Sequence, residues 1–172
     1  MKYQLLLVLA FSCLVAYHAA ADPQTERIRQ AAKENSTAFT TANYDRLVDL
    51  TYPKVVELLG GREKMIELLR RGAEDMKSHG SSILGADIAE PKEVITAGDK
   101  RFAIVPMIVH VKVPEGTLRT NGFLLAVSTD QGKAWTFIDG AGLTREKLTQ
   151  VFPDFPSEVS LPAPERPVLE PK

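Results

Sequence analysis

The chain changes from a helical to a strand pattern at Gly80, and this change limits the folds that it can adopt. Before Gly80, apolar residues recur three and four positions apart, as in amphipathic helices. Residues 101–113 (RFAIVPMIVHVKV) are rich in β-branched side chains and form the best strand candidate. Pro114-Glu115-Gly116 joins them to a second strand, 117–128. So short a connection permits only an antiparallel pair, because parallel strands need a crossover.

Three helices are predicted ahead of the strands. Asp22-Pro23 is a favourable start for the first, and Gly60-Gly61 separates the second from the third. We expect helices at 22–42, 44–50 with a restart at 53–59, 62–78 and 144–151, and further strands at 81–89, 93–97 and 133–139. Helices followed by antiparallel strands are typical of an α+β domain.

The predicted domain is residues 22–152. Residues 153–172 carry six of the eleven prolines and no periodicity, which predicts an extended or disordered arm outside the core.

The first 21 residues have the pattern of a secretory signal peptide. Lys2 supplies a positive start, residues 5–16 are apolar, and Ala19-Ala20-Ala21 precedes the predicted cleavage point. We expect a secreted or periplasmic protein with no membrane span after cleavage, the alternative being an uncleaved anchor. Cys13, the only cysteine, would leave with the signal, so the mature chain would have neither thiol nor disulfide.

Charge and motif content exclude several classes of function. The chain has 21 basic and 22 acidic side chains, without the basic excess of a nucleic-acid binder. Two separated histidines after residue 21, and no cysteine there, give no metal-ligand spacing. Gly60-Gly61 follows a helix rather than a strand, which is the wrong context for a phosphate-binding loop. We therefore expect no metal and no cofactor.

Both faces of the strand at 101–113 contain apolar residues. One face is wholly apolar and is the better core face: Ala103, Val105, Met107, Val109 and Val111. The other face holds Phe102, Ile104 and Ile108 beside His110 and Lys112. A sheet with one solvated face should alternate more cleanly, so we expect the outer face to be a homodimer surface.

The order of elements, and residues 44–69 (YDRLVDLTYPKVVELLGGREKMIELL), carry a family resemblance. Together with Gly61-Arg62-Glu63-Lys64-Met65-Ile66 and the late Gly132–Trp135 turn, they resemble the nuclear-transport-factor-2-like superfamily, also called cystatin-like, in a secreted bacterial-type form. The resemblance covers about residues 24–150. It implies a cone-shaped α+β roll: three helices packed on a curved antiparallel sheet of about five strands, with a conical pocket. Relatives include ketosteroid isomerase, scytalone dehydratase, polyketide cyclases and non-catalytic modules, and no catalytic residue of theirs can be placed on this chain.

The sharpest local motif is S-x-D-x-G-x-x-W, formed by Ser128, Asp130, Gly132 and Trp135. It is similar to the Asp-box hairpin of sialidases. An Asp that accepts turn amides and a Gly with positive φ would stabilise a hairpin, which is the interpretation that we favour. A single copy leaves carbohydrate contact as a lesser alternative.

The candidate pocket residues are polar or aromatic side chains that could line the cone. Asp139 could act as an acid or base, or could simply end a strand in a turn with Gly140. His110 could act as a general base, or could pack without a chemical role. The full set is Tyr44, Asp45, Tyr52, His110, Arg119, Trp135 and Asp139.

These observations favour an exported, non-catalytic ligand-binding or dimerisation module, with a small apolar ligand or a second copy as partner. The first alternative is a small cofactor-free lyase or isomerase with Asp45, His110 or Asp139 as acid or base. The second alternative is carbohydrate contact through the hairpin. A filled cone favours the module, whereas a deep pocket with a buried acid or histidine favours the enzyme.

Overall fold

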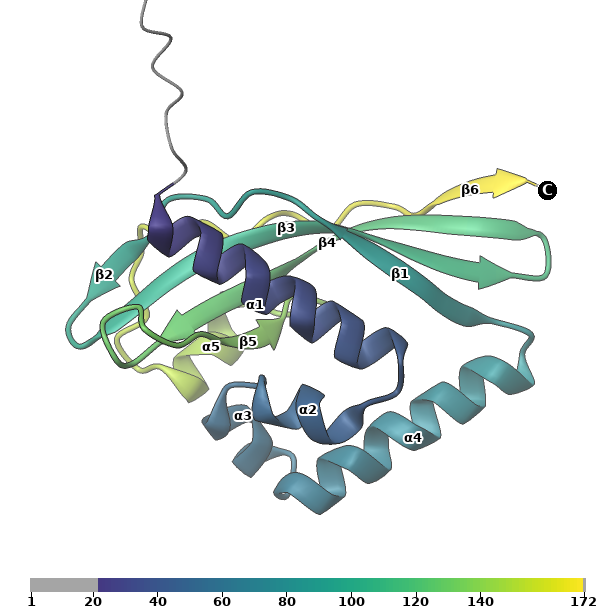
Figure 1. Ribbon diagram of the computed structural model, residues 1–172, viewed down its shortest axis with the longest axis horizontal. Coiled ribbons are helices and arrows are strands. Elements are labelled where there is room, and N and C mark those ends of the chain that lie inside the picture. The colour runs from purple at the N-terminus through teal and green to yellow at the C-terminus, as the bar shows by residue number, and fades with distance from the viewer. Residues whose placement is uncertain (1–21, 172) are drawn as a thin grey trace, which may run out of the picture.

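The computed structural model describes residues 22–171 as an α+β fold in which helices pack on a curled antiparallel sheet (Figure 1). The predicted signal peptide, residues 1–21, lies outside the described residues. The helices are α1 (Pro23–Thr40), α2 (Tyr44–Asp49), α3 (Pro53–Leu58), α4 (Arg62–Ser78) and α5 (Arg145–Val151). The strands are β1 (Ser82–Ile88), β2 (Ile95–Ala97), β3 (Lys100–Val113), β4 (Gly116–Ser128), β5 (Thr136–Asp139) and β6 (Val168–Pro171).

The long β3–β4 hairpin is the centre of the sheet. It pairs in continuous register from Arg101 opposite Ser128 to Val113 opposite Gly116, as the short connection predicts. β1 and β2 pair with β3, while β5 and β6 pair with β4. The sheet curls into a half-barrel, which fits the predicted cone-shaped roll (Figure 1).

Local sequence signals set the helix boundaries. The Asp22 carboxylate accepts the amide of Gln24 and Pro23 occupies the first helical position, so α1 begins there. Gly60 and Gly61 have φ of 92° and 90°, a backbone conformation that residues other than glycine rarely adopt, and they separate α3 from α4. The second helix ends before Pro53 and the chain restarts as α3, as predicted, so four helices rather than three precede the long strands.

Each face of the sheet carries its own core. On the concave face, α1 covers one cluster, made of Ile28, Ala32, Leu50, Ala103, Val105, Leu124, Ala126, Trp135 and Phe137. On the opposite face, the cluster is Phe102, Ile104, Phe123, Leu125, Val127, Ile138, Leu148, Phe152, Phe155 and Val159. The first half of β3 is therefore buried on both faces, which explains why its sequence does not alternate.

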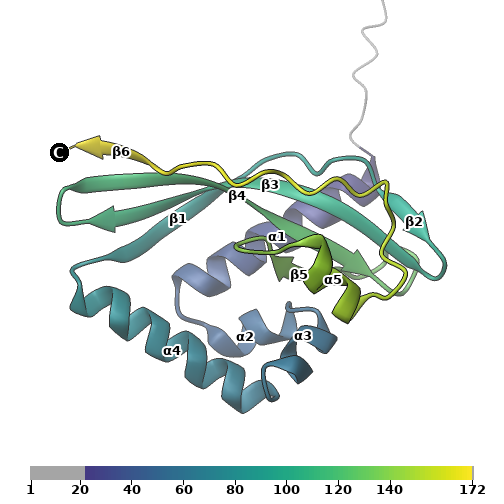
Figure 2. The same cartoon turned by 180° about the vertical axis from the view of Figure 1, so that it is seen from behind.

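The C-terminal segment covers the second face. Figure 2 shows α5 and the extended chain after it lying across the side of the sheet opposite α1. Phe155 and Val159 are buried there, so the expectation that residues 153–172 contribute nothing to the core is wrong. The Arg145 side chain donates to the carbonyls of Pro156, Ser157 and Val159, the last at 2.8 Å. The segment ends in β6, which adds a sixth strand to the five expected.

Candidate functional site

The concave side of the sheet is filled where α1 crosses it. Ile28 and Ala32 of α1 meet Trp135 and Phe137 there, and these side chains are almost fully buried. Trp135 is 4 % exposed, so its ring offers no surface on which a sugar could stack. The deep cone that an enzyme would need is therefore occupied by side chains at this position.

The seven predicted pocket residues do not converge. Tyr44 and Asp45 begin α2, and Asp45 forms an ion pair with Arg62 at 2.9 Å. Tyr52 belongs to the opposite core, with its ring centroid 4.9 Å from that of Phe152. Of the predicted seven, His110 and Arg119 are opposite each other across two strands, and the only other close pair is Tyr44 and Asp45, which are consecutive in the chain.

Asp139 occupies a turn at the end of β5. Its carboxylate accepts the amide of Ala141 at 2.7 Å, and the side chain is exposed. This is the hydrogen bond of a strand-ending turn, in which the aspartate stabilises its own backbone. Asp139 thus lies outside any arrangement with the other candidate acid or base groups.

His110 and Arg119 are opposite each other on β3 and β4 and form a polar row on the outer face of the sheet. The His110 Nε2 atom lies 2.8 Å from the Asp87 Oδ2 atom, and Arg119 donates to Glu170 at 3.1 Å. Asn121 donates to Glu165 at 2.6 Å, farther along the same strand. The contacts of Arg119 and Asn121 fasten the C-terminal segment to the sheet.

The Asp87 partner of His110 could not be found from sequence spacing. The two residues are 23 positions apart, and a bulge between Ile83 and Gly85 shifts the β1–β3 register that brings them together. A histidine beside a carboxylate is the arrangement of an oriented general base. Here the Asp87 side chain is 76 % exposed, and the row contains no serine, cysteine or threonine hydrogen-bonded to His110 among the described residues.

The hairpin motif is a closed network of hydrogen bonds. The Asp130 carboxylate accepts the amides of Lys133 and Ala134 at 3.0 Å and the Ser128 hydroxyl at 2.8 Å. The Ser128 oxygen in turn accepts the Gly132 amide at 2.8 Å, and Gly132 has a φ of 87°. With Trp135 packed into the core, every member of the motif stabilises the turn.

Replacing Asp130 by Asn is expected to lower the free energy of unfolding by about 1–2 kcal/mol at pH 7, because a charged acceptor of several hydrogen bonds is lost. The Ala134 amide and then the Ser128 hydroxyl lower the pKa of Asp130 below its ordinary value. A carboxyl with a lowered folded pKa stabilises the protein above its unfolded pKa of about 3.9, and this stabilisation disappears as the pH falls through the folded pKa.

Urea unfolding at a series of pH values checks this prediction. The difference between the parent chain and Asp130→Asn should shrink as the pH falls below about 4. The matched control, Asp154→Asn, changes an exposed aspartate of the C-terminal segment and should stay close to the parent throughout. A difference for Asp130→Asn that does not depend on pH contradicts the assigned role of its charge.

One side of α4 is the most conspicuous surface that the fold leaves open. Its sequence predicts a wide apolar stripe, yet only Met65 is buried. Leu68 is 42 % exposed, and a Cβ built on Gly72 meets no atom within 4 Å. We call the following residues the α4 face: Leu68, Leu69, Gly72, Ala73 and Met76.

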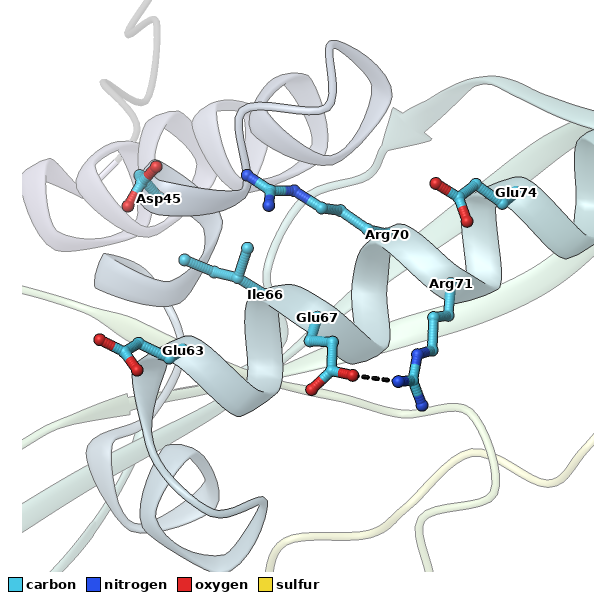
Figure 3. A pocket seen from close by; sticks show the side chains of 7 residues that line it. All are labelled: Asp45, Glu63, Ile66, Glu67, Arg70, Arg71 and Glu74. Carbon is cyan, nitrogen blue, oxygen red and sulfur yellow. Dashed lines mark ion pairs between the residues drawn. The ribbon is translucent and has the colours of Figure 1, made fainter.

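The neighbouring side of α4 is charged. Figure 3 shows a shallow depression lined by Ile66 and by charged residues of α4, with Asp45 of α2 at its border. Arg62 joins the helices by donating to Asp45 and, at 2.6 Å, to Asp49. These two carboxylates, Asp49 first, raise the pKa of Arg62. The only member of the predicted set in this depression is Asp45.

Within residues 22–171, no group of three or more histidine or acidic side chains is placed to hold a metal ion. In the same part of the chain, none of the helices combines the length and the apolar character needed to cross a bilayer. A second open depression lies between α1 and β1, with Lys33, Ser36 and Asp87 among its lining residues.

Comparisons of the chain with protein-family models, with curated proteins and with solved structures found no match.

Proposed function

We propose that this chain is an exported, non-catalytic binding module that holds a protein partner against the α4 face. The observation that carries the proposal is the incomplete burial of α4. A helix of 17 residues with a wide apolar stripe normally buries that stripe, and here only Met65 is buried, while its later apolar residues are half-buried or exposed. Export is proposed from the signal-peptide pattern of residues 1–21.

The positions of the titratable groups support a binding role over a catalytic one. A lyase or isomerase acting in the cone needs an acid or base inside it, close to the bound ligand. Asp45 pairs with Arg62 at the surface, His110 lies on the outer face, and Asp139 sits in a turn. The space beneath α1 is taken by Trp135 and its neighbours.

The exposed apolar side chains also support this surface. Leu58 and Leu59, at the end of α3, are 57 % and 41 % exposed, and Gly60 beside them approaches the Lys64 side chain of α4. The α4 face therefore continues toward the end of α3. Exposed apolar residues that gather on neighbouring elements are typical of protein interaction sites.

The Leu68→Asp substitution is expected to reduce the binding of an apolar dye to the folded protein. The dye 1-anilinonaphthalene-8-sulfonate fluoresces on exposed apolar surface, and its signal should fall to about half if the α4 face is the main such surface. Circular dichroism should show an unchanged fold, because Leu68 is at the surface.

Leu84→Asp is the matched control. Leu84 is 56 % exposed on β1, outside the α4 face, so its replacement should leave most of the dye signal in place. If Leu84→Asp removes the signal and Leu68→Asp does not, the binding surface lies elsewhere and the proposal is wrong.

A further inference from the structure

The α4 face is only partly covered along the part of the helix that extends beyond α2 and α3. Leu68, Gly72 and Ala73 are exposed there, whereas Leu69 and Met76 are half-buried. In Figures 1 and 2, α2 and α3 lie beside the first half of α4, and no other element lies along its outer side. The C-terminal segment, which covers the second face of the sheet, runs on the side of the molecule away from α4 (Figure 2). Among the described residues, no further element therefore covers the exposed part of this face.

The charges along the edge of the face have both signs. Lys64 and Asp75 flank Leu68 and Gly72, and they lie eleven positions apart, which is about three turns and places them on the same side of the helix. Helices that lie on anionic membranes carry mainly lysine and arginine at this position. The mixed signs here suit the surface of another protein better than a lipid surface.

We propose that the partner is a second copy of this chain, bound through an antiparallel, two-fold symmetric pairing of the two α4 faces. This inference rests on the proposed function and names its partner. In an antiparallel pair the same edges of the two helices meet. With the symmetry axis between Leu69 and Arg70, Lys64 faces Asp75 of the second copy, and the symmetry repeats this ion pair.

The contacts that Lys64 and Asp75 make within one chain leave both side chains able to form this ion pair with a second copy. Lys64 donates to Glu67 at 2.8 Å, while its side chain is 48 % exposed. Asp75 is 76 % exposed, with His79 as its neighbour at 3.7 Å. Exposed ion pairs of this kind contribute little to stability, so little free energy is lost when Lys64 and Asp75 change partners. Gly72 lets the second helix approach closely at the centre.

A parallel pair would not use the same surface. It would bring the Lys64 edge against the other edge of the stripe, near Ile66. That edge borders the depression shared with Asp45, and Arg62 ties α2 to the helix there. The antiparallel arrangement leaves α2 in place.

The other open edge of the fold is less suited to pairing. β6 is an edge strand with Val168 and Leu169 exposed, but Pro167 precedes it and Pro171 ends it. Proline cannot donate a main-chain hydrogen bond, and it commonly protects edge strands from further pairing. The α4 face has no such feature.

Charge reversal tests the pairing in the 172-residue chain, purified from a bacterial host. Sedimentation equilibrium of the parent should show a monomer–dimer equilibrium. Lys64→Asp alone and Asp75→Lys alone should each raise the dissociation constant at least about tenfold, because like charges then face each other. The double variant should restore it to within about threefold of the parent. Glu63→Lys, on the opposite side of α4, should have no effect.

Disulfide cross-linking gives the direction of the helices. A mixture of Lys64→Cys and Asp75→Cys should form mixed dimers on oxidation. Each variant alone should not, because identical residues would lie about 16 Å apart along the helices. The parent chain, whose only cysteine is Cys13, is the control for unintended links. Self-linking of the Lys64→Cys variant would contradict the antiparallel pairing.

Three outcomes separate this inference from the proposed function. A parent that stays monomeric up to about 1 mM, but whose dye binding still depends on Leu68, overturns self-association and leaves the α4 face as a site for another partner. A monomer that binds anionic vesicles through the α4 face overturns both, since its target is lipid. A dimer that is insensitive to charge reversal at Lys64 and Asp75 overturns the antiparallel pairing.

Discussion

A chain that ends at Phe152 is expected to unfold with a free energy about 3–5 kcal/mol lower than that of the full chain. The deletion removes Phe155 and Val159, which are buried against the second face of the sheet, and exposes part of that face to water. Urea unfolding followed by circular dichroism measures the loss. The shortened chain should also self-associate, since it exposes a large apolar surface.

A chain that ends at Leu161 is the matched control for this deletion. It keeps Phe155 and Val159 and loses only β6 and the segment before it. Every residue of β6 is exposed. Its free energy of unfolding should stay within about 1 kcal/mol of the parent value. If both shortened chains are as stable as the parent, the C-terminal segment does not cover the sheet in solution.

The Phe102→Ala substitution is expected to lower the free energy of unfolding by about 3–5 kcal/mol. Phe102 is 1 % exposed, and its ring makes edge contacts with Phe152 and Phe155 at centroid distances of 5.2 and 5.3 Å. Removing it leaves a cavity between the sheet and the C-terminal segment. Urea unfolding is again the measurement, and Phe39→Ala, at an exposed position on α1, is the control with a small expected effect.

The two changes should not be additive. In the chain that ends at Phe152, Phe102 keeps its contact with Phe152 but has already lost its contact with Phe155. Phe102→Ala should therefore lower the stability of that chain by less than it lowers the stability of the parent. Equal losses in both backgrounds would contradict the packing of Phe102 against the C-terminal segment.

The regular elements could be predicted from sequence because each has a local physical cause. Pro114-Glu115-Gly116 is too short for anything but a hairpin, and β3 and β4 pair across it without interruption. Asp22-Pro23 and Gly60-Gly61 mark helix ends through capping and positive φ. The alternation along β3 also correctly placed His110 on the face that holds Phe102.

The cover over the second face could not be predicted from periodicity. Phe155 and Val159 are isolated apolar residues among prolines, and a segment without regular structure has no period that reveals a buried side. The apolar residues on the outer face of β3 were therefore assigned to a homodimer surface. In the structure the chain's own C-terminal segment buries Phe102 and Ile104 there.

The candidate site shows the same limit. Strand parity tells which residues share a face, but it does not tell how far the helices extend over that face. Trp135 is under α1, whereas Tyr52 packs against Phe152 on the other side of the sheet. The openness of the α4 face likewise depends on where α2 and α3 stop along α4, which depends on tertiary packing and not on local sequence.

The position of Val159 near the C-terminus has a consequence for the order of events during biosynthesis. Every strand that contacts it is made first, so the second face of the sheet stays uncovered until residues 155–159 have been made. The growing chain thus has a long period in which apolar strands are exposed to other chains and to chaperones. The second face of the sheet can close only when residues 155–159 are free to pack against it.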